Sequence, residues 1–178
     1  CIKEVYPDVT LYAVDVDSQA IESALSDGVI DKGGNSIEAL PTSLDLVFVC
    51  VPLSLIKETV LSLSAYIQSE VILTDVGSVK VPFCGLSLSN SHTFIPGHPM
   101  AGSEKIGYEA SDKSLMHLSS YFLVSVDQSQ QETLLCNFLD SLGFQTHFID
   151  AEQHDRYMAM VSHFPYLLSG LTVASLDS

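Results

Sequence analysis

The chain has 178 residues, of which 47% are hydrophobic and 16% charged, so we expect a folded core rather than disorder. Its net charge of −15 argues against nucleic-acid and anionic-membrane partners, because both need a basic protein face. The 4 cysteines form no Cys-x-x-Cys pair, and no signal peptide or membrane-spanning apolar run occurs. We therefore predict a cytoplasmic protein without a metal site or a disulfide framework.

The start of the chain predicts a strand, an acidic residue and a helix. Residues 9–14 are rich in β-branched and aromatic side chains, and Asp15 follows them. Asp17 or Ser18 is placed to cap a helix that ends at Gly28. In dinucleotide-binding folds, an acidic residue after the second strand accepts hydrogen bonds from the adenosine ribose. Asp15 is therefore a candidate cofactor ligand.

This assignment places residues 1–5 at the tail of a first helix. A dinucleotide-binding unit begins with a strand and a Gly-rich loop, yet no Gly-x-Gly-x-x-Gly occurs in the chain. We expect that first strand and its loop to lie upstream of residue 1. The pyrophosphate site would then lie upstream as well.

The middle of the chain predicts two buried parallel strands joined by a helix. Residues 46–51 form an unbroken apolar run closed by Pro52, and residues 71–75 form the next strand. Apolar residues at helical spacing over 53–67 indicate the crossover helix, whereas 81–85 is a less regular candidate. Val51 and Pro52, at a carboxyl end of the sheet, are assigned to the cofactor site.

A third short strand, over 93–96, is predicted to end at Pro96-Gly97 and to place His98 at its carboxyl end. Sites in open α/β sheets lie at such ends, and imidazole titrates near neutrality. Gly97 and Gly102 would let the backbone approach a ligand closely. The alternative is a turn that happens to contain a histidine.

The remaining pattern predicts a strand over 121–126, a helix over 130–142, a strand over 145–149 and a helix from 151 onwards. Pro165 should kink this last helix or mark a helix start. The helix carries an apolar stripe: Met158, Val161, Phe164, Leu168 and Leu171. The order of strands and helices indicates an α/β, Rossmann-like fold with a mostly parallel sheet.

Three segments in order resemble the prephenate dehydrogenase family, which includes the arogenate dehydrogenases. The first is Asp-Val-Gly-Ser-Val-Lys at 75–80, and the second is Gly-His-Pro-Met-Ala-Gly-Ser-Glu at 97–104. The third is His-Asp at 154–155, followed by Ser-His-Phe-Pro at 162–165. The resemblance covers nearly the whole chain, and the ordered trio is strongly specific.

The resemblance implies two domains. Residues 1–150 would form the dinucleotide-binding domain, lacking its first strand and Gly loop. Residues 151–178 would form the first helix of an all-helical dimerisation domain, most of it beyond Ser178, so a homodimer is implied. As a fragment, the chain would be a poor catalyst that tends to self-associate.

The implied reaction is the oxidative decarboxylation of prephenate to 4-hydroxyphenylpyruvate in tyrosine biosynthesis, with NAD as hydride acceptor. NADP is disfavoured, because Asp15 would repel a 2′-phosphate and neither Val16 nor Asp17 is basic. The alternatives are an arogenate dehydrogenase and a catalytically inactive binding or interaction module. A hydroxyacid or imine reductase of Rossmann type would lack the segment around His98.

Within this resemblance, His98 is the catalytic group that withdraws the proton of the ring hydroxyl as hydride leaves. Ser78 would orient that imidazole or bind substrate, although an ordinary helix cap is its alternative. Glu104 would lie near the substrate mouth, unless it only caps a helix. His163 would contact substrate rather than fill a core, and Tyr166 stands where many members carry a second histidine.

Three further positions receive the ordinary structural interpretation. Lys80 is taken as a solvated surface lysine, and the pair His154-Asp155 as a capping and solvated pair near a helix start. Arg156 matches no motif position. The family's substrate-binding arginine would fall after Ser178.

Overall fold

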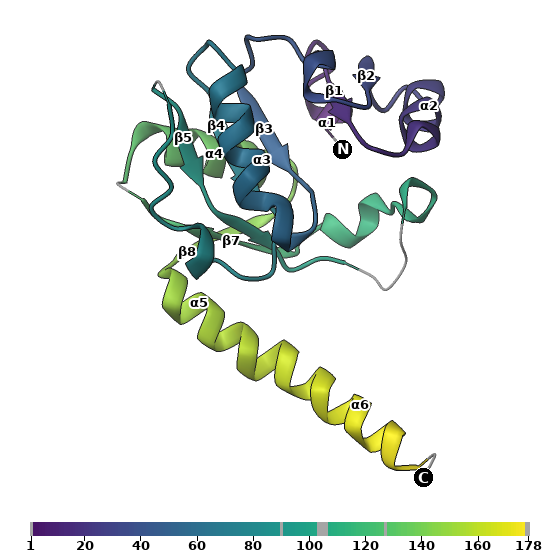
Figure 1. The fold of residues 1–178 in the computed structure, drawn as a ribbon, viewed down its shortest axis with the longest axis vertical. Coiled ribbons are helices and arrows are strands. Elements are labelled where there is room, and N and C mark those ends of the chain that lie inside the picture. Colours follow the sequence, from purple (N-terminus) through teal and green to yellow (C-terminus); the bar gives the residue numbers. More distant parts are fainter. Residues whose placement is uncertain (1, 90, 103–106, 127, 177–178) are drawn as a thin grey trace.

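The computed structural model describes residues 2–89, 91–102, 107–126 and 128–176 (Figure 1). The strands are β1 (Tyr12–Val14), β2 (Lys32–Gly34), β3 (Leu46–Val49), β4 (Ile72–Asp75), β5 (Thr93–Ile95), β6 (Gly97–Pro99), β7 (Ser120–Val124) and β8 (Gln145–Ile149). The α-helices are α1 (Ile2–Val5), α2 (Ser18–Ser26), α3 (Leu53–Tyr66), α4 (Gln130–Ser141), α5 (Ala151–Met158) and α6 (Phe164–Leu176). Short 3₁₀ turns are η1 (Ile37–Ala39), η2 (Val81–Phe83), η3 (Tyr108–Ala110) and η4 (Lys113–Met116), and η5 (Ala159–His163) is a π-helical turn.

The strand pairings are mostly parallel, as predicted. β1 pairs with β2, β3 with β4, β4 with β5 and β7 with β8, all in parallel. β6 pairs with β7 in the antiparallel sense. A parallel neighbour requires a crossover, and α2, α3 and α4 provide it for the pairs β1–β2, β3–β4 and β7–β8, whereas the connection from β4 to β5 contains only the turn η2. The α/β, Rossmann-like fold class is confirmed.

The apolar strands in the middle of the chain are covered on both faces. Val49 and Leu73 pack in one cluster with Ile56 and Val60 of α3. The alternate positions of the same strands, such as Phe48, pack against the second cluster, which is formed around Leu135 and Leu139 of α4 together with Ile95, Tyr121, Leu123 and Phe144. Because successive side chains point to opposite faces of a strand, an unbroken apolar run is what a doubly covered strand requires.

His98 lies inside a strand, and not in the turn after one. The extended chain runs through β5 beside β4, passes Pro96, and continues as β6 beside β7, with His98 opposite Phe122. Pro96 has no N–H for a ladder, so the pairing partner changes there, while its carbonyl accepts a hydrogen bond from the Val124 N–H at 2.9 Å. The predicted end of strand 93–96 is therefore a switch between two sheets.

The first βα unit forms much as its sequence predicts. Asp17 caps α2 by accepting a hydrogen bond from the Gln19 N–H at 2.9 Å, and Gly28 follows the helix with a φ of +67°. Asp15 comes directly after β1. Downstream, the weak helix candidate at 81–85 is only the single 3₁₀ turn η2, because Pro82 lies within it.

The carboxyl-terminal helical segment runs away from the body of the molecule as a long rod (Figure 1). Asp150 caps α5 by accepting from the N–H groups of Glu152 and Gln153. Pro165 is the second residue of α6, which agrees with the predicted helix start, and the rod has no sharp kink. The π turn η5 widens the helix just before it, with the Phe164 N–H bonded to the Ala159 carbonyl. No helix of the described residues is long and apolar enough to cross a membrane.

Candidate active site

The side chains of His98, His154 and Asp155 form a continuous hydrogen-bonded row. His98 Nδ1 lies 2.9 Å from His154 Nε2, and His154 Nδ1 lies 2.8 Å from Asp155 Oδ1. The two imidazole rings meet edge to face, with centroids 5.1 Å apart and an interplanar angle of 73°. The row joins the histidine of β6 to the first turns of α5.

His154 is fully buried, which contradicts the expected capping and solvated pair. The capping role belongs to Asp150, so His154 and Asp155 lie one turn further along α5. Phe122 of β7 packs edge-on against the His154 ring at 6.0 Å between centroids. Asp155 accepts hydrogen bonds from the backbone N–H groups of Lys80 at 2.7 Å and Val81 at 3.0 Å.

Lys80 is also fully buried, so its expected place on the surface is wrong. Its Nζ donates to Asp75 Oδ2 at 2.5 Å and to the Gly97 carbonyl at 2.6 Å. Asp75 is completely buried as well and accepts from the Gly97 N–H at 3.1 Å. Burial lowers the pKa of Lys80 from its ordinary value, while the Asp75 carboxylate opposes that change.

The surroundings of His98 keep its imidazole neutral. Burial, together with the neighbouring His154, Lys80 and His163, lowers its pKa from 6.5 to about 4, although Asp155 acts in the opposite direction. A neutral imidazole has one nitrogen free to accept a proton. At neutral pH, His98 is therefore in the state that a general base requires.

The other predicted substrate contacts within the described residues lie on the helical rod and after β4. His163, at the end of η5, is half-buried and influences His98 electrostatically. Tyr166 is 80% exposed on α6. Ser78 is half-buried after β4, and within the described residues it makes no hydrogen bond to His98. Glu104 lies outside the described residues. The assigned roles of these residues stay predictions.

The predicted cofactor residues follow strands of the parallel sheets. Asp15 follows β1 and is exposed, and its Oδ1 accepts a hydrogen bond from the Asp17 N–H at 2.9 Å. Val51 and Pro52 lie between β3 and α3, with Pro52 exposed at the N-cap of the helix. Carboxyl ends of parallel strands are where α/β proteins bind nucleotides. The assignment of these residues to a cofactor stays a prediction.

Gly97 serves internal packing. A Cβ at this position would lie 2.7 Å from Tyr121 Cε1 and 2.9 Å from the Asp75 carbonyl oxygen. A Cβ at Gly102 would meet nothing within 4 Å. The sequence predicts that the backbone at Gly97 approaches a ligand closely. In the structure, the groups that it approaches closely are those of β4 and β7.

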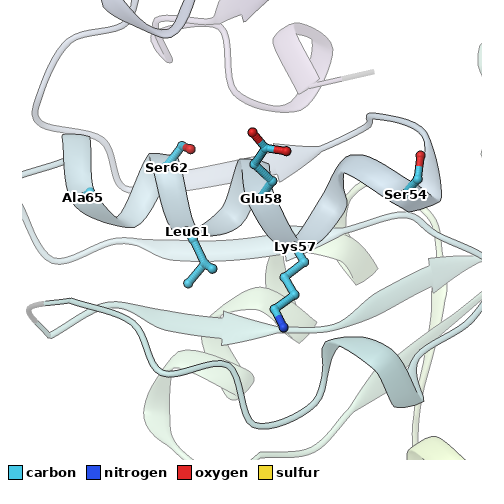
Figure 2. A pocket seen from close by; sticks show the side chains of 6 residues that line it. All are labelled: Ser54, Lys57, Glu58, Leu61, Ser62 and Ala65. Carbon is cyan, nitrogen blue, oxygen red and sulfur yellow. The ribbon is translucent and has the colours of Figure 1, made fainter.

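Two surface hollows of the described chain lie away from this site. One is an open depression along the outer face of α3, and Figure 2 shows its lining side chains: Ser54, Lys57, Glu58, Leu61, Ser62 and Ala65. Another lies between the segment 83–88, β5 and the end of β7. Neither of these two hollows contains His98. The described residues include no cluster that could hold a metal ion.

Lys80, His154 and Asp155 lie in the sequence motifs, but the roles that the structure shows for them differ from the expected solvated positions. Lys80 is the last residue of the first segment, and His154-Asp155 opens the third. Their presence in the ordered trio was the available signal. The polarity of these side chains predicts surface positions, because charged residues are most often solvated, and this prediction is wrong for Lys80 and His154.

Strands covered on both faces by helices, with an acidic residue after β1, define a nucleotide-binding domain of Rossmann type. The chain belongs to the prephenate dehydrogenase family: the family described as "Prephenate dehydrogenase, nucleotide-binding domain" matches residues 1–146. The prephenate dehydrogenase of Bacillus subtilis (strain 168) is 29% identical over 97% of this chain and 48% of its own length.

Two solved structures extend the comparison. A prephenate dehydrogenase from Aquifex aeolicus, in complex with hydroxyphenyl propionate and NAD⁺, superposes with a TM-score of 0.87 and 26% identity, covering 99% of this chain and 63% of that one. A Synechocystis arogenate dehydrogenase superposes with a TM-score of 0.83 and 26% identity, and the match covers 95% of this chain and 61% of that one. The chain spans about half the length of the curated relatives it matches.

Proposed function

We propose that this protein catalyses the oxidative decarboxylation of prephenate to 4-hydroxyphenylpyruvate, with NAD as hydride acceptor, in tyrosine biosynthesis. The observation that carries the proposal is the neutral, partly buried imidazole of His98, which belongs to the family's Gly-His-Pro segment. A hydrogen bond to His154 holds this imidazole in place. The similarity to prephenate dehydrogenases over nearly the whole chain supports it.

The residues present fit the cofactor. Asp15 offers an exposed carboxylate after β1, with one oxygen bonded to the Asp17 N–H, and a carboxylate at that place suits the diol of an adenosine ribose. Val51 and Pro52 would line the cofactor site at the carboxyl end of β3. Bound NAD would supply the acceptor for the hydride on the ring carbon that bears the hydroxyl.

His98 would accept the proton of that hydroxyl and later return it. As the hydride leaves the ring carbon, the O–H bond breaks, its proton passes to His98, and its electron pair forms a carbonyl. The bond from the opposite ring carbon to its carboxylate then breaks and releases carbon dioxide. Its electron pair makes the ring aromatic and returns charge to the oxygen, which regains the proton from His98. No net proton is released, so a single base suffices.

His163 and Tyr166 are the proposed substrate contacts on the helical rod, with Ser78 and Glu104 as further candidates. A histidine donates or accepts one hydrogen bond at each nitrogen, and a phenol can donate one. Arogenate is the alternative substrate, because an arogenate dehydrogenase is among the similar structures. Steady-state kinetics with both substrates decide between them.

We also infer that the helical segment from residue 151 onwards, which comprises α5, η5 and α6, is the first helix of an all-helical dimerisation domain, and that the protein is a homodimer. Met158 of the predicted stripe packs into the body, whereas the others stay exposed: Val161 by 65%, Phe164 by 64%, Leu168 by 55% and Leu171 by 69%. Covering such a stripe stabilises an association by several kcal/mol, at about 25 cal/mol per Å². Sedimentation velocity measures the oligomeric state.

The test of the function is the variant His98→Asn, assayed through the absorbance of reduced nicotinamide. Turnover should fall by about 10²- to 10⁴-fold, while NAD still binds. His117→Asn is the matched control, because His117 is an exposed histidine at the end of η4, outside the proposed site. Near-normal turnover of His98→Asn would refute the role of His98. If the unaltered protein binds NAD but turns over neither substrate, it is a binding module.

A further inference from the structure

The row from Asp155 to His98 determines which nitrogen of His98 carries a proton. We propose that His154 and Asp155 are positioning residues that hold His98 with its proton on Nδ1, so that Nε2 is the base. This inference rests on the proposed function, in which His98 accepts the substrate's hydroxyl proton. The assignment starts at the Asp155 end of the row.

Asp155 is an acceptor in all of its described contacts. Backbone N–H groups only donate, so both carboxylate oxygens accept: Oδ1 from Lys80 at 2.7 Å and Oδ2 from Val81 at 3.0 Å. Burial acts to raise the pKa of Asp155, but the hydrogen bonds from His154, Val81 and Lys80 outweigh it and hold the pKa below its ordinary value. Asp155 is therefore ionised at neutral pH.

An ionised carboxylate requires a donor from His154. The contact of 2.8 Å between His154 Nδ1 and Asp155 Oδ1 therefore places a proton on Nδ1. With the single N–H of a neutral imidazole placed on Nδ1, His154 Nε2 is left as an acceptor. Because His154 Nε2 lies 2.9 Å from His98 Nδ1, that nitrogen of His98 must be the donor. The free lone pair of His98 is then on Nε2.

The surroundings leave this arrangement little freedom. His154 is fully buried and packs edge-on against Phe122, which is also the strand partner of His98. Asp155 is fixed to the backbone between β4 and η2. A ring flip of His98 would turn a carbon towards His154 Nε2 and leave that buried acceptor without its bond, at a cost typical of a lost buried hydrogen bond.

The direct test is NMR of the ring nitrogens in protein labelled with ¹⁵N-histidine, with the His98 signals assigned by their loss in His98→Asn. At neutral pH, we expect His98 to show a protonated Nδ1 and an unprotonated Nε2. The Asp155→Asn variant should lose this preference, because an amide can either donate to or accept from His154. A protonated Nε2 on His98 in the unaltered protein would overturn the proposal.

A pair of variants separates positioning from packing. His154→Gln keeps an oxygen that can accept from His98, whereas His154→Leu has a similar volume and no acceptor. We expect kcat to fall about 10- to 100-fold in His154→Leu and in Asp155→Asn, with most activity retained in His154→Gln and the KM for NAD unchanged in all three. Equal losses in the Gln and Leu variants would show a packing role only.

The two readouts fail independently. The ring-nitrogen spectrum needs neither substrate nor turnover, so it tests the proton arrangement even if the protein acts on another molecule. If the unaltered protein turns over neither prephenate nor arogenate, the proposed function fails while the spectrum can still support the tautomer. Thermal unfolding of each variant by circular dichroism identifies any variant that does not fold, and the spectrum of the unaltered protein still decides.

Discussion

Replacing Lys80 by methionine should destabilise the protein strongly, although the two side chains have similar length. Lys80 and Asp75 are both completely buried and joined at 2.5 Å, so the substitution leaves a carboxylate inside the protein without its cation. Removing one partner of a buried ion pair typically costs about 3–5 kcal/mol. Asp75 keeps hydrogen bonds from the N–H groups of Gly77 and Gly97, which places the cost near the lower end of that range.

The loss of the second Lys80 bond, to the Gly97 carbonyl, adds about 1 kcal/mol. We therefore expect Lys80→Met to lower the free energy of unfolding by about 3–4 kcal/mol, which for a chain of this size lowers Tm by roughly 10 °C. Urea denaturation followed by circular dichroism measures the change. Lys57→Met is the matched control, because Lys57 is exposed on α3 and its loss should cost less than about 0.5 kcal/mol.

A second variant tests whether the cost comes from the unpaired carboxylate. In Asp75→Asn/Lys80→Met the buried charge is removed with its partner, so the double variant should lose much less than the sum of the two single variants. A free energy of unfolding of Lys80→Met within about 1 kcal/mol of that of the unaltered protein would refute this explanation. It is also refuted if the two single costs simply add, since that would mean the pair does not interact.

Three further predictions follow from the site. Gly97→Ala should lower both stability and turnover, because its Cβ would lie under 3 Å from β4 and β7, whereas Gly102→Ala should leave the free energy of unfolding unchanged in urea denaturation. As the pH falls from 6.5 towards about 4, the unfolded chain takes up a proton at His98 that the folded chain does not, so the free energy of unfolding should decrease. A shallower decrease in His98→Asn would identify His98 as the source, whereas an unchanged slope would contradict it. Asp15→Asn should reduce the ratio of kcat/KM for NAD over NADP by about tenfold, and an unchanged ratio would exclude Asp15 from cofactor selection.

The elements that sequence predicts well are those whose signals are local. A short polar side chain before an apolar periodic run predicts a helix cap at Asp17 or Ser18, and the structure shows that Asp17 makes the capping bond. The buried strands β3 and β4 follow from unbroken apolar runs. The ends of these elements moved by a few residues, because strand ends are set by pairing partners that the local sequence does not contain.

The roles of Lys80 and His154 depend on distant contacts. Lys80 is buried because Asp75 and the Gly97 carbonyl meet it, and His154 because β6 and β7 close over α5. The Asp155 carboxylate bonds to backbone 74–75 positions earlier in the chain. Periodicity and composition describe residues that are close in the sequence, so they do not reveal contacts between residues this far apart in the chain. Without such contacts, a lysine and a His-Asp pair are expected to lie in solvent.

Lys80 connects the structural and the chemical parts of the site. Its side chain holds the carbonyl of Gly97, directly before His98, while its backbone N–H holds Asp155, from which the row of hydrogen bonds returns to His98. One residue thus fixes both the backbone that carries the imidazole and the carboxylate at the end of the row. A shift at Lys80 would move the base and its proton arrangement together. This coupling gives a physical reason for a fully buried lysine to stand in the same motif as Asp75.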